Sequence, residues 1–135
     1  MTRPDITFAV SLVARFTAAL GSPHWTAVKR VFRYLTATAD YGLCYSGNEG
    51  EAGRLSPMCD ADLGGDRDSR CSTSVYVFTM CGAAVDWISR LQKSVACSTV
   101  EAEYMSLSLC AWNAVWLRNL LRSEERRVGK ECSQG

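Results

Sequence analysis

Hydrophobic positions in the first forty residues recur at helical spacing. Residues 4–20 place apolar side chains near one helical face, with Pro4 suited to a first helical position and Gly21 to a C-cap. A second helix is predicted from Ser22 as its N-cap, with Pro23 at the first helical position. Its apolar side carries Trp25, Val28, Phe32 and Leu35. The chain is therefore expected to open with two short helices.

After Asp40 the pattern changes to short runs that favour strands. "YGLCYS" (41–46) and "RLSPMCD" (54–60) read as short strands around a turn at 47–53, although Pro57 is awkward inside a strand. "STSVYVFTM" (72–80) and "AAVDWIS" (83–89) are rich in β-branched and aromatic residues, and the two residues between them fit a hairpin. A long helix is predicted from Ser98 to about Leu121. The order of elements is typical of an α+β fold.

The last predicted helix carries two glutamates with different roles. Ser98 and Glu101 have the spacing of a capping box, in which the carboxylate folds back onto the N-cap amide. Glu103 instead heads a stripe of apolar side chains at steps of three and four, and this stripe is expected to pack on the sheet. Its members are Leu107, Cys110, Ala114, Leu117 and Leu121.

A cluster of aspartates, "CDADLGGD" (59–66), follows the strand at 54–60. A calcium loop does not fit, because Gly64 and Cys71 occupy positions that need oxygen ligands. Two interpretations remain, a solvated turn or a site where Asp60 and Glu103 converge on Mg²⁺. Asp62 is expected to be a neighbour of that site, whereas Asp66 and Asp68 are expected to form a turn.

Composition narrows the function classes only slightly. The net charge is +1, and no apolar run is long enough to span a membrane. The N-terminus lacks the layout of a signal peptide, and the odd number of seven cysteines argues against a disulfide framework. We therefore expect an intracellular protein that is not secreted. The basic residues Lys29, Arg30 and Arg33 could contact nucleic acid or form a solvated helix face.

Four segments together resemble the Copia-type (Ty1/Copia) retrotransposon polyprotein, where the reverse transcriptase ends and ribonuclease H begins. They are "HWTAVKRVFRYLTATADYGLCY", "CDADLGGDRDSRCSTSVYVF", "AAVDWISRLQKSVACSTVEAEYMSLS" and "NAVWLRNLL". The resemblance implies residues 1–40 as a reverse-transcriptase connection remnant and 41–121 as the N-terminal half of a ribonuclease H-like domain. The implied fold is a truncated ribonuclease H-like fold, with antiparallel strands plus the first helix, preceded by two short helices.

The resemblance also implies the chemistry. Ribonucleases H of this family hydrolyse the RNA strand of RNA–DNA hybrids with two divalent metals, Mg²⁺ or Mn²⁺, and Asp60 and Glu103 match the first two of four carboxylates. Because only two of the four carboxylates are present, the chain is expected to bind metal weakly and to be inactive or nearly so. No small-molecule substrate is expected. Departures such as Leu63 and Val75 suggest a drifting copy. The alternatives are a non-catalytic nucleic-acid-binding module and a non-functional relic.

The charged tail "RSEERRVGKEC" continues no motif of that family. It resembles the translation of a common sequencing adapter, which predicts that residues 122–135 are non-native. A natural charged tail is the alternative.

Overall fold

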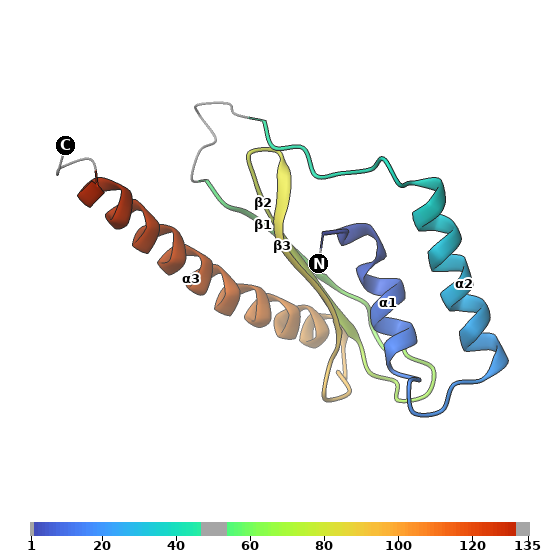
Figure 1. Cartoon of the computed structure of the whole chain (residues 1–135). Helices are drawn as coiled ribbons and strands as arrows, with labels where there is room; N and C mark the ends of the chain where they lie inside the picture. The colour runs from blue at the N-terminus through green and yellow to red at the C-terminus, as the bar shows by residue number, and fades with distance from the viewer. Residues whose placement is uncertain (1, 47–53, 132–135) are drawn as a thin grey trace.

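A three-stranded antiparallel sheet separates one long helix from two short ones (Figure 1). The computed structural model describes residues 2–46 and 54–131, with residues 125–131 described as helical backbone only. The elements in chain order are the 3-10 turn η1 (Pro4–Ile6), α1 (Thr7–Ala14), α2 (Ser22–Ala37), β1 (Ser56–Ala61), β2 (Thr73–Met80), β3 (Ala83–Leu91) and α3 (Thr99–Glu131). Helix α3 lies against β1 and β2, α1 lies against β3, and α2 packs on α1. The mixed α and β arrangement agrees with the sequence prediction.

The sheet is a meander in the order β1-β2-β3. The strand predictions for β1, β2 and β3 are confirmed, and Pro57 is tolerated because β1 pairs only with β2 among the described strands. Cys81 and Gly82 connect β2 to β3 with φ angles of 52° and 82°. Two consecutive positive φ angles are the mark of the hairpin turn that matches strand twist. The predicted hairpin is therefore confirmed.

The hydrophobic core lies between β2 and α3. Tyr76 and Phe78 are two positions apart in β2, so they lie on the same face, and they are 5% and 0% exposed. Their ring centroids are 5.3 Å apart in an edge-to-face arrangement. Helix α3 faces them with small side chains at every fourth position, Ala102, Ser106 and Cys110, all of them buried. Small side chains at this spacing allow the helix to lie close to the strands. Burial also raises the pKa of Cys110 to about 11, which keeps its thiol protonated.

The buried stripe of α3 differs from its prediction by one position. Glu103 and Leu107, predicted to face the sheet, are exposed, whereas Ala102 and Ser106 are buried. The predicted stripe gave weight to large apolar residues, but the close approach of helix and sheet selects small ones. Cys110 and Leu117 are buried as predicted.

The ends of two predicted helices also differ. Helix α3 continues beyond Leu121 to Glu131, so the predicted stop is wrong, while the origin of residues 122–135 stays a prediction. At the N-terminus, α1 ends at Ala14 because the following turns close with hydrogen bonds to the third preceding carbonyl, as from Phe16 N to Val13 O.

The N-cap of α2 is a different residue from the one predicted. Gly21, predicted to end the first helix, is instead the N-cap of α2, and its N–H donates to Nδ1 of His24 at 3.0 Å. Ser22, predicted as the N-cap, is the first residue of the helix. Trp25 and Phe32 on the predicted apolar side are 56% and 63% exposed. The half-buried face of α2 runs instead through His24, Val28, Val31 and Leu35.

A network around Arg3 joins the N-terminus to the end of α2. Its guanidinium donates to Asp5 and to the Thr38 carbonyl, and Tyr34 donates to the same Asp5 carboxylate at 2.8 Å. The hydrogen bond from Arg3 holds the pKa of Asp5 down at about 2. The connection from α2 to β1 forms no strand at "YGLCYS", contrary to prediction, although Ser46 N donates to the Cys81 carbonyl. The predicted turn at 47–53 lies outside the described residues.

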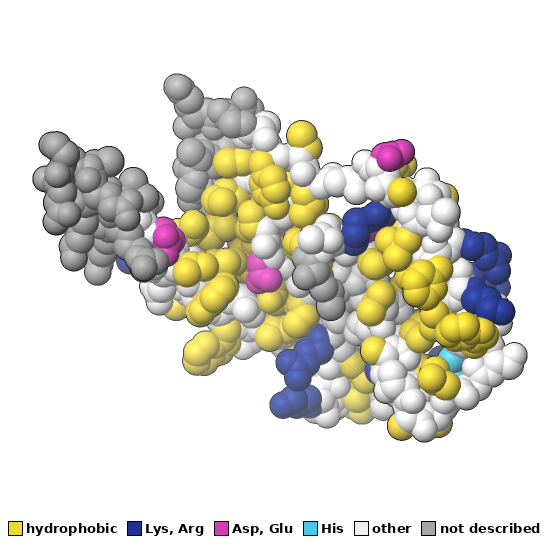
Figure 2. All heavy atoms as spheres, in the orientation of Figure 1, with side chains coloured by type: hydrophobic (Ala, Val, Ile, Leu, Met, Phe, Trp, Pro, Cys, Tyr) yellow, Lys and Arg dark blue, Asp and Glu magenta, His cyan; other side chains and the backbone are white. Residues whose placement is uncertain are grey.

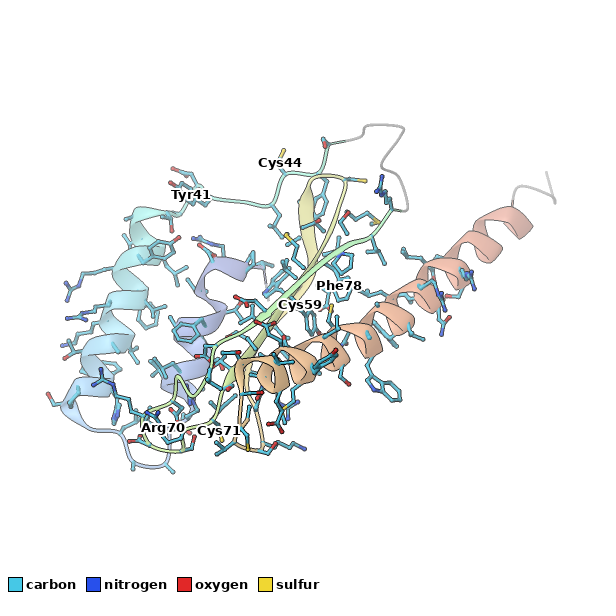
Figure 3. All side chains as sticks on the ribbon, turned by 180° about the vertical axis from the view of Figure 1, so that it is seen from behind. Tyr41, Cys44, Cys59, Arg70, Cys71 and Phe78 are labelled. Carbon is cyan, nitrogen blue, oxygen red and sulfur yellow. The ribbon has the colours of Figure 1, made fainter. Side chains whose placement is uncertain are left out.

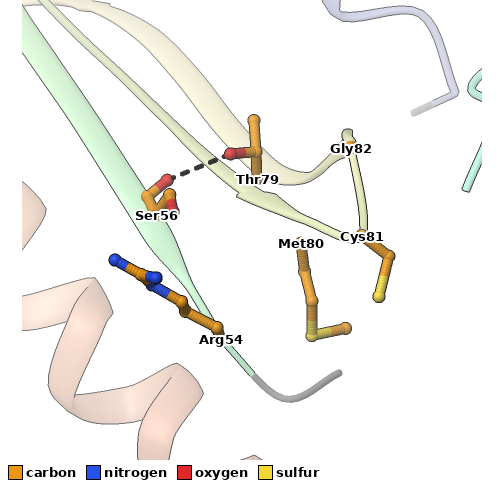
Figure 4. Close-up of a pocket in the computed structure, with 6 residues that line it drawn as sticks. All are labelled: Arg54, Ser56, Thr79, Met80, Cys81 and Gly82. Carbon is orange, nitrogen blue, oxygen red and sulfur yellow. Dashed lines mark hydrogen bonds between the residues drawn. The ribbon is translucent and has the colours of Figure 1, made fainter. Parts of the chain in front are cut away.

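A shallow cavity of about 320 Å³ lies beside the β2–β3 hairpin, between the start of β1 and the turn (Figure 4). Across it the Thr79 hydroxyl donates to the Ser56 carbonyl at 3.3 Å. No helix among the described residues has the length and apolar content needed to cross a membrane.

Candidate functional site

Asp60 lies in the penultimate position of β1, where the strand passes α3. Its neighbour Cys59 packs against the core under α3. Since strand side chains alternate, the Asp60 carboxylate leaves the strand away from that core and is exposed. Its Oδ1 accepts a hydrogen bond from the Ala61 N–H at 2.9 Å. The carboxylate is therefore available to a cation in solvent without the cost of burial.

Ser106 connects α3 to the backbone at Asp60. Ser106 is 1% exposed, and its hydroxyl oxygen lies 2.7 Å from the Asp60 carbonyl oxygen and 3.2 Å from the Val75 carbonyl oxygen. Asp60 and Val75 are direct partners in the β1–β2 ladder. One buried hydroxyl thus holds α3 against both strands at the position of the candidate ligand.

Replacing Ser106 by alanine is expected to destabilise the fold by about 1–3 kcal/mol, because buried carbonyls then lose a donor that water cannot replace. The measurement is urea unfolding followed by circular dichroism. Ser108→Ala is the matched control, since Ser108 is exposed on the same helix and alanine is the better helix former. Equal midpoints for the two variants would contradict the role given to Ser106.

Glu103 lies one helical turn before Ser106, with its carboxylate exposed. It lines a cavity of about 580 Å³ together with Cys59 and Tyr104, so the helix turn that carries it borders β1 next to Asp60. The structure therefore brings the backbone of Asp60 and the helix turn of Glu103 together, and both carboxylates face solvent.

The Asp60–Glu103 pair suits a hard divalent ion in part. Mg²⁺ is commonly held by one or two carboxylates and keeps several waters. Neither carboxylate forms an ion pair with a described side chain. Within the part of the chain that the structure describes, however, no three acidic, histidine or cysteine side chains gather as a metal site. A metal ion at either carboxylate would therefore depend on waters and substrate for most of its ligands.

The other aspartates of the "CDADLGGD" segment hold the β1–β2 loop. Asp62 accepts a hydrogen bond from the Thr73 N–H at the start of β2. Asp66 accepts from the N–H and hydroxyl of Ser69, and these bonds, with the nearby Arg15, lower its pKa. These two side chains are loop anchors.

Arg15 was not identified from the sequence. Its guanidinium lies 2.9 Å from Asp66 and joins the end of α1 to the loop, across 51 positions of the chain. No spacing rule connects residues so far apart, and its basic charge alone gave no signal.

The caps of α3 are local. The Glu101 N–H donates to the Ser98 hydroxyl at 3.2 Å, while the Glu101 carboxylate accepts from the Cys97 N–H at 2.7 Å. The carboxylate therefore reaches the amide one residue before the N-cap, instead of the Ser98 amide that the capping box predicts.

A second surface lies on α2, where Lys29, Arg30 and Arg33 are exposed beside aromatic side chains. Lys29 Nζ lies 5.8 Å from the ring centre of Trp25, a cation–π distance. Figure 2 shows Lys and Arg side chains along this helix next to hydrophobic ones. Cations interleaved with exposed rings are typical of surfaces that bind single-stranded nucleic acid.

Comparison with known proteins found no matching family model and no matching solved structure. The chain is 44% identical over 121 residues to the retrovirus-related Pol polyprotein from transposon TNT 1-94 of Nicotiana tabacum, and 36% identical over 120 residues to that from transposon RE2 of Arabidopsis thaliana. These matches cover 90% and 89% of the chain but only 9% and 8% of the relatives. The chain thus spans less than a tenth of the length of these polyproteins.

A third relative is the secreted RxLR effector protein 161 of Plasmopara viticola, 45% identical over 117 residues, or 87% of the chain and 81% of the relative. The prediction of an intracellular protein that is not secreted is contradicted by this relative, which is named as secreted. The prediction rested on the layout of a short N-terminal stretch and on the number of cysteines, and neither determines where a protein is located.

Proposed function

Because the chain belongs to the Copia-type retrotransposon Pol polyproteins, we propose that residues 41–121 are the first part of a ribonuclease H-like unit. Residues 1–40 are then the end of the preceding reverse-transcriptase region. In the intact polyprotein this unit hydrolyses the RNA strand of an RNA–DNA hybrid. In this chain Asp60 and Glu103 take the places of the first two carboxylates.

The observation that carries this proposal is the hydrogen bond from Ser106 to the Asp60 carbonyl at 2.7 Å. It supports a shared site because it fixes the helix turn after Glu103 onto the strand that carries Asp60. The two carboxylates are 43 positions apart in the chain, and both are exposed, although Asp60 leaves β1 on the face opposite α3. Among the described strands β1 lies at the edge of the sheet, so a shared cation would have to lie beyond that edge, where side chains from both faces of β1 could reach it.

The role of each residue follows from its environment. Asp60 and Glu103 would hold the ion, Ser106 positions the backbone between them, and Asp62 and Asp66 shape the adjoining loop. When bound, divalent metal ions supply an activated water and stabilise the leaving oxygen of phosphodiester hydrolysis. With two carboxylates the affinity for Mg²⁺ is expected to be weak, so this 135-residue chain should show little or no cleavage.

Metal titration with Mn²⁺ tests the site without relying on activity. Amide NMR signals of residues next to Asp60 and Glu103 should broaden first, and Asp60→Asn should abolish this selectivity. Asp68→Asn is the matched control, because Asp68 is an exposed aspartate of the adjoining loop. Uniform broadening over all acidic residues would refute a shared site. In parallel, a labelled RNA–DNA hybrid with Mg²⁺ should stay intact, and robust cleavage lost in Asp60→Asn would contradict the expected inactivity.

The exposed Trp25, Lys29 and Arg33 on α2 favour a second candidate function, a nucleic-acid-binding module without catalysis. The labelled hybrid distinguishes the two functions. Binding that weakens steeply with salt, is lost in Lys29→Glu and is unchanged in Asp60→Asn would support the module. Binding that needs Mn²⁺ and Asp60 would support the metal site.

A further inference from the structure

Two cysteines meet in the interface of β1 and α3. Cys110 of α3 belongs to the buried core around Tyr76 and Phe78, and Cys59 of β1 packs against that core, near enough to Cys110 to contribute to its raised pKa. Figure 3 shows Cys59 on the strand beside Phe78, where β1 passes the long helix. Cys110 is 4% exposed, whereas Cys59 is half-buried and lines the cavity that Glu103 borders. A small molecule can therefore reach Cys59 but not Cys110.

We propose that Cys59 and Cys110 form an oxidation site, at which hydrogen peroxide converts the two thiols into a disulfide that joins β1 to α3. No disulfide links the cysteines of the described residues in the present state. The proposal concerns core residues of this chain and is independent of nuclease activity.

The reaction is balanced with one equivalent of peroxide. The Cys59 sulfur attacks one peroxide oxygen, the O–O bond breaks, and the thiol proton leaves with the second oxygen as water. The sulfur of Cys110 then attacks the resulting sulfenic acid, forming the S–S bond and releasing a second water that carries the Cys110 proton. Two thiols lose two electrons in total, and peroxide accepts them.

The two thiols differ in their roles. Cys59 reacts first because the cavity beside it admits peroxide. Cys110 resolves the sulfenic acid, and its contact with Cys59 makes up for a thiol that burial keeps protonated at neutral pH. Over-oxidation of Cys59 is prevented because the second thiol is already adjacent.

The bond would tie the middle of α3 to the strand residue next to Asp60. It closes the chain between positions 59 and 110, which restricts the unfolded chain and stabilises the folded one. The oxidised form should therefore melt at a higher temperature than the reduced form, and a thiol reductant should reverse the shift.

The test is to treat the full chain with hydrogen peroxide and map its peptides under non-reducing conditions. Most of the Cys59 peptide should be linked to the Cys110 peptide, and the link should disappear with reductant. Cys44→Ser, which removes an exposed cysteine, should leave the link unchanged. Cys110→Ala should abolish it and leave a Cys59 sulfenic acid that dimedone traps.

The Cys59→Ser variant, close in size, keeps the proposal testable if Cys110→Ala fails to fold. It should lose both the link and the melting-temperature shift while unfolding cooperatively. Cys59 recovered mainly as sulfinic acid, linked to another cysteine, or unmodified while Cys44 is oxidised would each overturn the proposal.

Discussion

Phe78→Ala should unfold the protein or lower its stability by about 3–5 kcal/mol, the range for a buried aromatic side chain reduced to a methyl group. Phe78 is fully buried at 0% exposure, in edge-to-face contact with Tyr76 and opposite the small residues of α3. The small side chains of α3 cannot move into the cavity, because the helix backbone is already close to the sheet. Domains of this size have about 5–15 kcal/mol of stability, so the loss is a large part of the total. Thermal unfolding followed by circular dichroism measures it.

Phe32→Ala is the matched control, because it removes the same atoms from a side chain that is 63% exposed on α2. Its melting temperature should stay within a few degrees of the original. Equal losses in the two variants would mean that β2 and α3 do not form the core. A cooperative transition in the unmodified chain would also argue against a relic that never folds, since such a chain would melt without one.

The sheet could be predicted from the sequence because its signals are local. Residues 72–80 and 83–89 carry period-two patterns rich in β-branched and aromatic residues, and Cys81–Gly82 between them leaves room only for a tight turn. The start of α3 was similarly readable from Ser98. By contrast, residues 41–46 share the β-prone composition but pair with no strand among the described residues, and composition alone cannot tell whether a neighbour exists.

The candidate site was only partly predictable. Asp60 could be singled out because several aspartates cluster where a predicted strand ends, and Glu103 because it heads a stripe of apolar side chains. The premise for Glu103 was wrong, since the buried stripe runs through Ala102 and Ser106. Ser106 gave no signal, because a serine within a helix ordinarily bonds to its own backbone or to water. Its bond to Asp60 depends on how closely α3 approaches β1, which is a property of the fold and not of the local sequence.

Gly65→Ala should be the most damaging change in the loop after β1, at about 1–3 kcal/mol, the usual cost of forcing an extra group into a packed site. A Cβ on Gly65 would overlap the carboxylate of Asp62. That carboxylate cannot move away freely, because it accepts a hydrogen bond from the Thr73 N–H at the start of β2. The added methyl must therefore break this bond or shift the loop. Gly42→Ala is the matched control, since nothing lies within 4 Å of a Cβ there.

The cause can be separated from a general effect of alanine by combining the change with Asp62→Ala. Asp62→Ala alone should cost the hydrogen bond to Thr73, but it also removes the group that the new Cβ meets. The double variant should therefore be less destabilised than the sum of the two single variants, with a coupling of about 0.5–3 kcal/mol. The free energies of unfolding of the four proteins, obtained from denaturant titrations, give this coupling. If the two losses simply add, the overlap with Asp62 is not what requires glycine at position 65, and the loop must need it for another reason.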